Sequence, residues 1–152
     1  IINNTASFIP DASLYLFGIL ESKMHMAWMS YVCGRMKSDF IYSNKIVYNN
    51  YPWPENVNEK QTKAVEKAVE GVLSARKEFP TYSLADLYDP LTMPPVLVKA
   101  HQELDKAVDL CYRPQPFINA AKRIEFLFEL YEKYTADLFT KEKPKKEKKA
   151  KS

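Results

Sequence analysis

Apolar residues recur every three or four positions along most of this chain, which is the period of an amphipathic α-helix. The first such stretch follows Pro10, where Asp11 is the expected N-cap. Its apolar positions are Leu14, Phe17, Ile19, Leu20, Met24, Trp28, Tyr31 and Val32. Glu21 and Ser22 can divide the stretch into two helices, with Ser22 capping the second, and Gly34 is the expected C-terminal stop.

The period changes between Lys37 and Tyr51. The stretch "DFIYSNKIVYNNY" is rich in β-branched and aromatic residues and has no helical stripe. We expect an extended segment around residues 38–42, a Ser-Asn turn, and a second extended piece around residues 46–49. The two prolines of "YPWP" end this region, because proline lacks a backbone donor and pushes the preceding residue toward extended geometry. This block is therefore expected to be a rigid aromatic linker.

Further amphipathic stretches follow the linker. We expect helices from Asn58 to about Lys77, from about Met93 to Cys111 and from about Phe117 to Leu138, with a short helix in "SLADLY" capped by Ser83. The apolar faces of the three long helices can bury one another, so residues 58–138 are expected to fold alone as a small three-helix bundle. The predicted fold class is mainly α, with one short extended or β segment near residues 38–50.

Composition and charge narrow the class of protein. The 152 residues are 46% hydrophobic, enough for one domain or two small units with separate cores. No run of about 18 apolar residues indicates a membrane span. The tail from Lys141 holds seven Lys and two Glu, a net of +5, which leaves −2 for the rest of a chain whose total is +3. We expect the tail to be disordered and solvated, although it could help to hold a polyanion.

Catalytic and metal-binding patterns are not found in the sequence. Only three glycines occur, without a dinucleotide-binding or phosphate-binding loop. His25 and His101 have no second ligand at metal spacing. Cys33 and Cys111 form no CxxC pair, which favours two buried thiols in a reducing cytoplasm. The chain begins without Met and shows no signal peptide, so we expect a cytoplasmic fragment of a longer protein.

One segment, residues 33–55, concentrates charged, amide and hydroxyl side chains between an apolar helix and the aromatic linker. The blocks "LYLFGILESKMHMAWMSYVCGRMKSDFIYSNKIVYNNYPWP", "SLADLYDPLTMPPVLVKAHQELDKAVD" and "RIEFLFELYEKY" contain this segment and most of the chain. Long, ordered and specific, they resemble the C-terminal end of type IIL restriction-modification enzymes, the MmeI-like family. The resemblance spans roughly residues 9–134.

The resemblance implies a large polypeptide with a nuclease domain, an adenine-N6 DNA methyltransferase domain, a target recognition domain and a terminal helical domain. Residues 1–54 would end the recognition domain, residues 55–139 would form the helical domain, and residues 140–152 the Lys-rich tail. The catalytic motifs lie upstream in that family. S-adenosylmethionine, and Mg²⁺ for any nuclease, are therefore expected in the parent protein and not in this fragment. The implied partners are double-stranded DNA and the upstream domains, with no membrane.

Within the resemblance, the positions matching Lys37 and Asp39 help to choose a base pair. Residues two apart on an extended segment point to one side, where Lys can donate to guanine O6 and N7 and Asp can accept from cytosine N4. A surface Lys–Asp ion pair is the plainer alternative. Contacts to the DNA backbone are assigned to Arg35, Tyr42, Ser43, Asn44, Lys45 and Asn49. Many relatives have Arg where this chain has Ile41, so any contact made by that Arg is missing or comes from Lys45 or Arg35.

A second function fits the same sequence. The fragment could be a helical docking or structural module of the parent enzyme with no direct DNA contact. The helices after residue 54 have ordinary amphipathic faces and no basic stripe, so this interpretation suits them better. The two functions can therefore be divided between the two parts of the chain.

Overall fold

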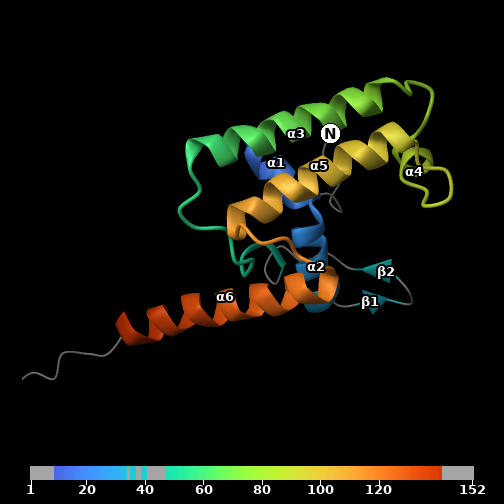
Figure 1. Ribbon diagram of the computed structural model, residues 1–152. Coiled ribbons are helices and arrows are strands. Elements are labelled where there is room, and N and C mark those ends of the chain that lie inside the picture. The colour runs from blue at the N-terminus through green and yellow to red at the C-terminus, as the bar shows by residue number, and fades with distance from the viewer. Residues whose placement is uncertain (1–8, 34, 37–38, 41–46, 142–152) are drawn as a thin grey trace, which may run out of the picture.

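The computed structural model of the protein describes residues 9–33, 35–36, 39–40 and 47–141. Within these ranges it consists of six helices and one short antiparallel hairpin (Figure 1). The helices are α1 (Leu14–Glu21), α2 (Lys23–Val32), α3 (Glu59–Lys77), α4 (Leu84–Leu87), α5 (Pro95–Tyr112) and α6 (Ala120–Lys141), and the strands are β1 (Arg35–Met36) and β2 (Asp39–Phe40). The prediction of a mainly α chain is confirmed.

The junction between α1 and α2 is built by a buried serine. Ser22 has an extended backbone; its hydroxyl donates to the Ile19 carbonyl at 2.6 Å and accepts from the His25 N–H at 3.4 Å. The predicted division is therefore correct. The predicted cap of α1 is wrong, because Asp11 has a positive φ of 53° outside the helix and Ser13 accepts from the Leu16 N–H instead.

The starts of the later helices follow their local capping signals. Asn58 and Gln61 form a reciprocal capping box at α3, and Ser83 and Asp86 form another at α4. Pro95 occupies the first position of α5, where its missing N–H has no helical partner to lose. Helix α6 starts three residues later than predicted, because the Asn119 side chain accepts from the Lys122 N–H at 3.0 Å.

The core is organised around the antiparallel pair of α3 and α5, with α1 packed against one side of the pair. Val65 and Val69 from α3 are fully buried in this core, as are Leu104 and Val108 from α5. Helix α6 packs against α2, and it also contacts the C-terminal end of α5. The three-helix grouping predicted for residues 58–138 therefore differs from the structure: α1 takes the place expected for α6. Amphipathic periodicity gives each helix a buried face but does not select its partner.

The hairpin also differs in part from the prediction. Asp39 and Phe40 are extended as expected, but their partner strand is Arg35–Met36, which precedes them. The second predicted extended piece, around residues 46–49, is wrong in its described part, because Val47 and Tyr48 lie in a helical turn followed by a turn at Asn49. Val47 is fully buried, and packing of this side chain against the helices replaces strand pairing.

Metal and membrane sites are not found in the described ranges. These ranges contain no group of three or more His, Cys, Asp or Glu that could hold a metal ion. None of their helices is long and apolar enough to cross a bilayer. Cys33 and Cys111 are both buried, as predicted.

Candidate functional site

The hairpin β1–β2 extends from the C-terminal end of α2 (Figure 1). Its register pairs Arg35 with Phe40 and Met36 with Asp39, so the chain reverses between Met36 and Asp39. Lys37 lies outside the described residues, between the two strands. This hairpin does not give Lys37 and Asp39 the common side that one continuous extended segment would give, and their base-reading assignment stays a prediction.

The structure describes some of the other candidate residues and not the rest. Arg35 is the first residue of β1, and Asn49 is exposed in the turn that follows Val47. The remaining candidates lie outside the described residues: Tyr42, Ser43, Asn44 and Lys45. Except for Asn49, all the candidates lie in the sequence between Cys33, next to the end of α2, and Val47. The candidate site is therefore one chain segment, which begins at the C-terminal end of α2 and ends near Val47.

The C-terminal end of this segment is anchored to α2, the helix that precedes the segment. The Trp28 indole Nε1 donates to the Val47 carbonyl at 3.0 Å, and both residues are almost completely buried. A buried carbonyl left without a donor costs about 1–3 kcal/mol, so this bond favours one position for the returning chain. The preceding end is held by the Cys33 N–H, which donates to the Met29 carbonyl at 2.9 Å. Both ends of the candidate site are thus fixed on α2.

The aromatic linker that follows this segment is packed between helices. Tyr51 is 3% exposed and packs edge-on against His25, with ring centroids 4.7 Å apart. The Tyr112 hydroxyl of α5 lies 2.7 Å from the Tyr51 hydroxyl and 3.0 Å from the Pro52 carbonyl oxygen. Burial raises the pKa of Tyr51 far above its usual range, so the phenol stays neutral.

Helix α6 completes this packing. The Tyr134 hydroxyl donates to the Trp53 carbonyl at 2.9 Å, and the Trp53 ring packs edge-on against Tyr51 and Tyr48. These aromatic side chains pack within the protein, as the interpretation of this block as a rigid linker requires. The candidate site is therefore supported on three helices, α2, α5 and α6.

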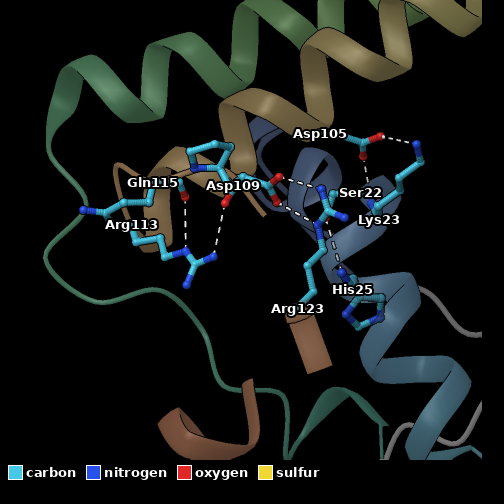
Figure 2. Close-up of polar contacts among 9 residues, drawn as sticks. Ser22, Lys23, His25, Asp105, Asp109, Arg113, Gln115 and Arg123 are labelled. Atoms are coloured by element: carbon cyan, nitrogen blue, oxygen red, sulfur yellow. Dashed lines mark hydrogen bonds and ion pairs between the residues drawn. The ribbon is translucent and has the colours of Figure 1, made fainter. Parts of the chain in front are cut away.

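Buried charges fix these helices relative to one another (Figure 2). Asp105 of α5 accepts from the Lys23 backbone N–H at 2.8 Å, at the first residue of α2. Arg123 of α6 forms a two-point ion pair with Asp109 of α5, at 3.0 and 2.6 Å. Burial raises the pKa of Asp105, and the hydrogen bond from Lys23 opposes that rise. One turn of α5 thus positions both α2 and α6.

Our sequence reasoning did not identify these supporting charges. Asp105 and Asp109 are four residues apart, so they lie on one face of α5. They alternate with Leu104 and Val108, which are fully buried. Carboxylates inside an apolar stripe are a signal of a buried polar contact, because burying an unpaired charge is costly. The signal marks the two carboxylates but does not identify Arg123 as a partner.

Comparison with known proteins relates both parts of the chain to one family. Residues 1–55 match the family model for the MmeI target recognition domain, and residues 57–139 match the model for the MmeI C-terminal domain. DNA methyltransferase A of Bacillus subtilis (strain 168) is 41% identical over 135 residues, which cover 89% of this chain and 15% of that protein.

A solved structure gives the same relationship in three dimensions. The type IIL restriction-modification enzyme MmeI, in complex with DNA, is 51% identical and superposes with a TM-score of 0.81. The match covers 84% of this chain and 17% of that enzyme. The chain therefore spans less than a fifth of the length of either relative.

Proposed function

The chain belongs to the MmeI family, in which it corresponds to target recognition and C-terminal domain sequence, and we propose that its residues 33–50 help to select the DNA target of a methyltransferase. The observation that carries this proposal is the anchored hairpin. It lies within the residues that match the recognition domain, and the segment that contains it, from Cys33 to Val47, is tied to α2 at both ends. The major groove of DNA admits a two-stranded β-ribbon, and base reading requires such an element to be held rigidly.

The parent protein, on this proposal, is an S-adenosylmethionine-dependent adenine-N6 DNA methyltransferase of the type IIL restriction-modification class. Its cofactor site, and any Mg²⁺-dependent nuclease, belong to upstream domains. This chain supplies no catalytic group. Its partners are double-stranded DNA and those upstream domains, and its compartment is the cytoplasm. The similarity to a methyltransferase and to a DNA-bound restriction-modification enzyme supports this assignment.

Two residues of the hairpin segment are assigned to base reading. Lys37 donates to guanine and Asp39 accepts from cytosine of one G·C pair, each contact contributing about 1–3 kcal/mol of discrimination. Contacts to phosphate and sugar, which set the register on DNA without reading sequence, are assigned to Arg35, Tyr42, Ser43, Asn44, Lys45 and Asn49. Asp39 pairs with Met36 at the end of the hairpin where the chain reverses, which supports a role for this residue away from α2.

Exchange of the two charges tests the assignment. In the full-length parent, Lys37→Glu combined with Asp39→Arg should reverse the preferred orientation of the base pair from G·C to C·G. Mapping methylated adenines across the genome of an expressing strain reads the recognised motif directly. A change of motif, with modification retained at the new sites, supports base reading.

A matched exchange on α3 is the control. Glu59 and Lys63 form an exposed i,i+4 ion pair with a 2.6 Å separation, so Glu59→Lys with Lys63→Glu exchanges equal charges away from the hairpin. This control should leave the motif unchanged. If the Lys37 and Asp39 exchange also leaves it unchanged, the two residues form only a surface ion pair and the assignment is wrong.

For residues 55–139 we propose the docking function, with no direct contact to DNA. The favouring observation is an open, largely apolar groove between α3 and α5. An exposed apolar groove on a domain cut from a longer polypeptide suits contact with protein better than contact with phosphates. A full-length parent whose α3–α5 surface is protected from solvent without DNA would support this function, and protection only after DNA is added would contradict it.

A further inference from the structure

The α3–α5 pair has two grooves, and α1 fills one of them. Helix α1 crosses this groove at Gly18. A Cβ at Gly18 would lie 2.6 Å from the Val65 Cγ1 and 2.8 Å from the Val69 Cγ2. Since real Cβ atoms essentially never come under 3.0 Å, α1 can lie this close only because residue 18 is glycine. The packed groove thus shows what a helix needs in order to rest on this pair.

The groove on the other side has the same kind of surface and is open. It holds about 580 Å³, and its floor includes Ala64, Ala68 and Gly71 from α3 and Ala100, Ala107 and Leu110 from α5. Gly71 is exposed in the middle of α3, and a Cβ there would meet no heavy atom of the described chain within 4 Å. Glycine in a helix interior is unfavourable by about 1 kcal/mol relative to alanine. Packing among the described residues gives no reason for a glycine at this position.

The rim of the open groove is positively charged. Lys67, Lys99 and Lys106 line it together with one acid, Glu103. Among the described residues, none of these four side chains takes part in an ion pair within 4 Å. Their charges are therefore available to a partner. An apolar floor with a basic rim is complementary to a helix that has one apolar face and acidic flanks.

We propose that this groove docks an acidic amphipathic helix from the upstream part of the same polypeptide, which rests over Gly71 as α1 rests at Gly18. The length of the relatives supports this source: the chain spans 15% and 17% of them, so most of such a polypeptide lies outside this chain. The proposal rests on the docking function of residues 55–139 and is independent of base reading by the hairpin.

DNA is a poorer occupant of the groove. A phosphate backbone offers no apolar surface to cover the alanines and Leu110, and Glu103 would repel it. The hairpin also lies at the C-terminal end of α2, whereas α3 packs on α1, which precedes α2 (Figure 1). DNA bound at the hairpin would therefore approach a different part of the molecule. These observations favour a protein helix.

Photocrosslinking in the full-length parent identifies the occupant. Lys99, exposed on the rim of the groove, is replaced by the photoreactive amino acid p-benzoylphenylalanine, and the crosslinked peptides are mapped by mass spectrometry with and without duplex DNA. The same replacement at Lys63, exposed on α3 and outside the groove, is the matched control. The expected result is a crosslink within one polypeptide from position 99 to an upstream peptide rich in Asp and Glu, which position 63 does not form. A crosslink to DNA or to a second copy, or equal patterns at the two positions, would overturn the proposal.

A second pair of variants measures docking without a crosslinker. Gly71→Trp fills the groove, whereas Lys63→Trp adds the same side chain to α3 outside the groove. Hydrogen exchange of the upstream docked helix should accelerate by about tenfold or more in the Gly71 variant, which corresponds to a loss of about 1.4 kcal/mol, and stay unchanged in the Lys63 variant. Equal exchange in the two variants would overturn the proposal. The methylated DNA motif should be the same in both, which separates this test from the charge exchange at Lys37 and Asp39.

Discussion

The two glycines in α1 and α3 allow the same Gly→Ala substitution to be compared at a crowded position and at an open one. Gly18→Ala introduces a methyl group 2.6 and 2.8 Å from two valine methyl groups, whereas Gly71→Ala introduces it where no heavy atom lies within 4 Å. Both changes gain the same helix propensity, about 1 kcal/mol. The difference between the two variants therefore isolates the cost of forcing α1 away from α3.

The structure sets the size of that difference. Ordinary contacts begin at 3.4 Å, so the new methyl group must move roughly 0.6–0.8 Å away from Val65 and Val69. Valine has one strongly preferred χ1 rotamer in a helix, so these side chains cannot turn aside at low cost. Overpacking of this kind costs about 1–3 kcal/mol. We expect Gly71→Ala to stabilise the chain by about 0.5–1 kcal/mol and Gly18→Ala to be less stable than Gly71→Ala by about 1–3 kcal/mol.

Urea denaturation followed by helical circular dichroism measures both variants. With a slope of about 1–3 kcal/mol per molar urea, a 2 kcal/mol difference separates their midpoints by about 1 M. Equal stabilisation by the two substitutions would refute the close approach of α1 at Gly18. A loss of stability in Gly71→Ala would show that the groove beside α3 is filled within this chain itself.

Three further variants test the supports of the candidate site. Burial lowers the pKa of His25 to about 4, below its unfolded value of 6.5, so protonation favours the unfolded chain. The stability of the folded chain is therefore full above pH 6.5 and falls by about 2 kcal/mol as the pH drops to 5. His25→Phe should remove most of this pH dependence, which urea melts at both pH values measure. Arg123→Met leaves the Asp109 carboxylate buried and unpaired and should cost about 3–5 kcal/mol, whereas adding Asp109→Leu should recover most of that loss in a double-mutant cycle. Trp28→Phe removes the donor to the Val47 carbonyl and should accelerate amide exchange around residue 47 while the amides of α3 stay protected.

The separate helical unit predicted for residues 58–138 can now be tested against the structure. Helix α6 packs on α2, and α1 covers Val65 and Val69. A chain that begins at residue 58 would expose both surfaces and lose apolar burial on two helices. We expect its denaturant transition to be broad compared with that of the whole chain. A sharp transition of equal midpoint would instead support independent folding of this segment.

Local signals in the sequence predicted the helix boundaries well, because the groups that decide them are a few residues apart. Asn58 with Gln61 and Ser83 with Asp86 reach their own backbone amides whatever the rest of the chain does. The predicted cap of α1 was wrong because Asp11 and Ser13 are both suitable N-cap residues two positions apart, and local preference alone does not rank them. The chemical character of residues 33–50 was also visible, because it lies in the side chains themselves.

The sequence by itself determined a mainly α chain, the caps of α2 and α4, the buried thiols and the polar segment that departs from the helical pattern. Only the tertiary structure decided that α1 and not α6 completes the α3–α5 core, and that Trp28 secures the return of the hairpin segment at Val47. It also decided that Asp109 of α5 meets Arg123 of α6. The physical reason is that an apolar stripe or a buried charge requires a partner without specifying which one, and complementary shape supplies the choice, as at Gly18.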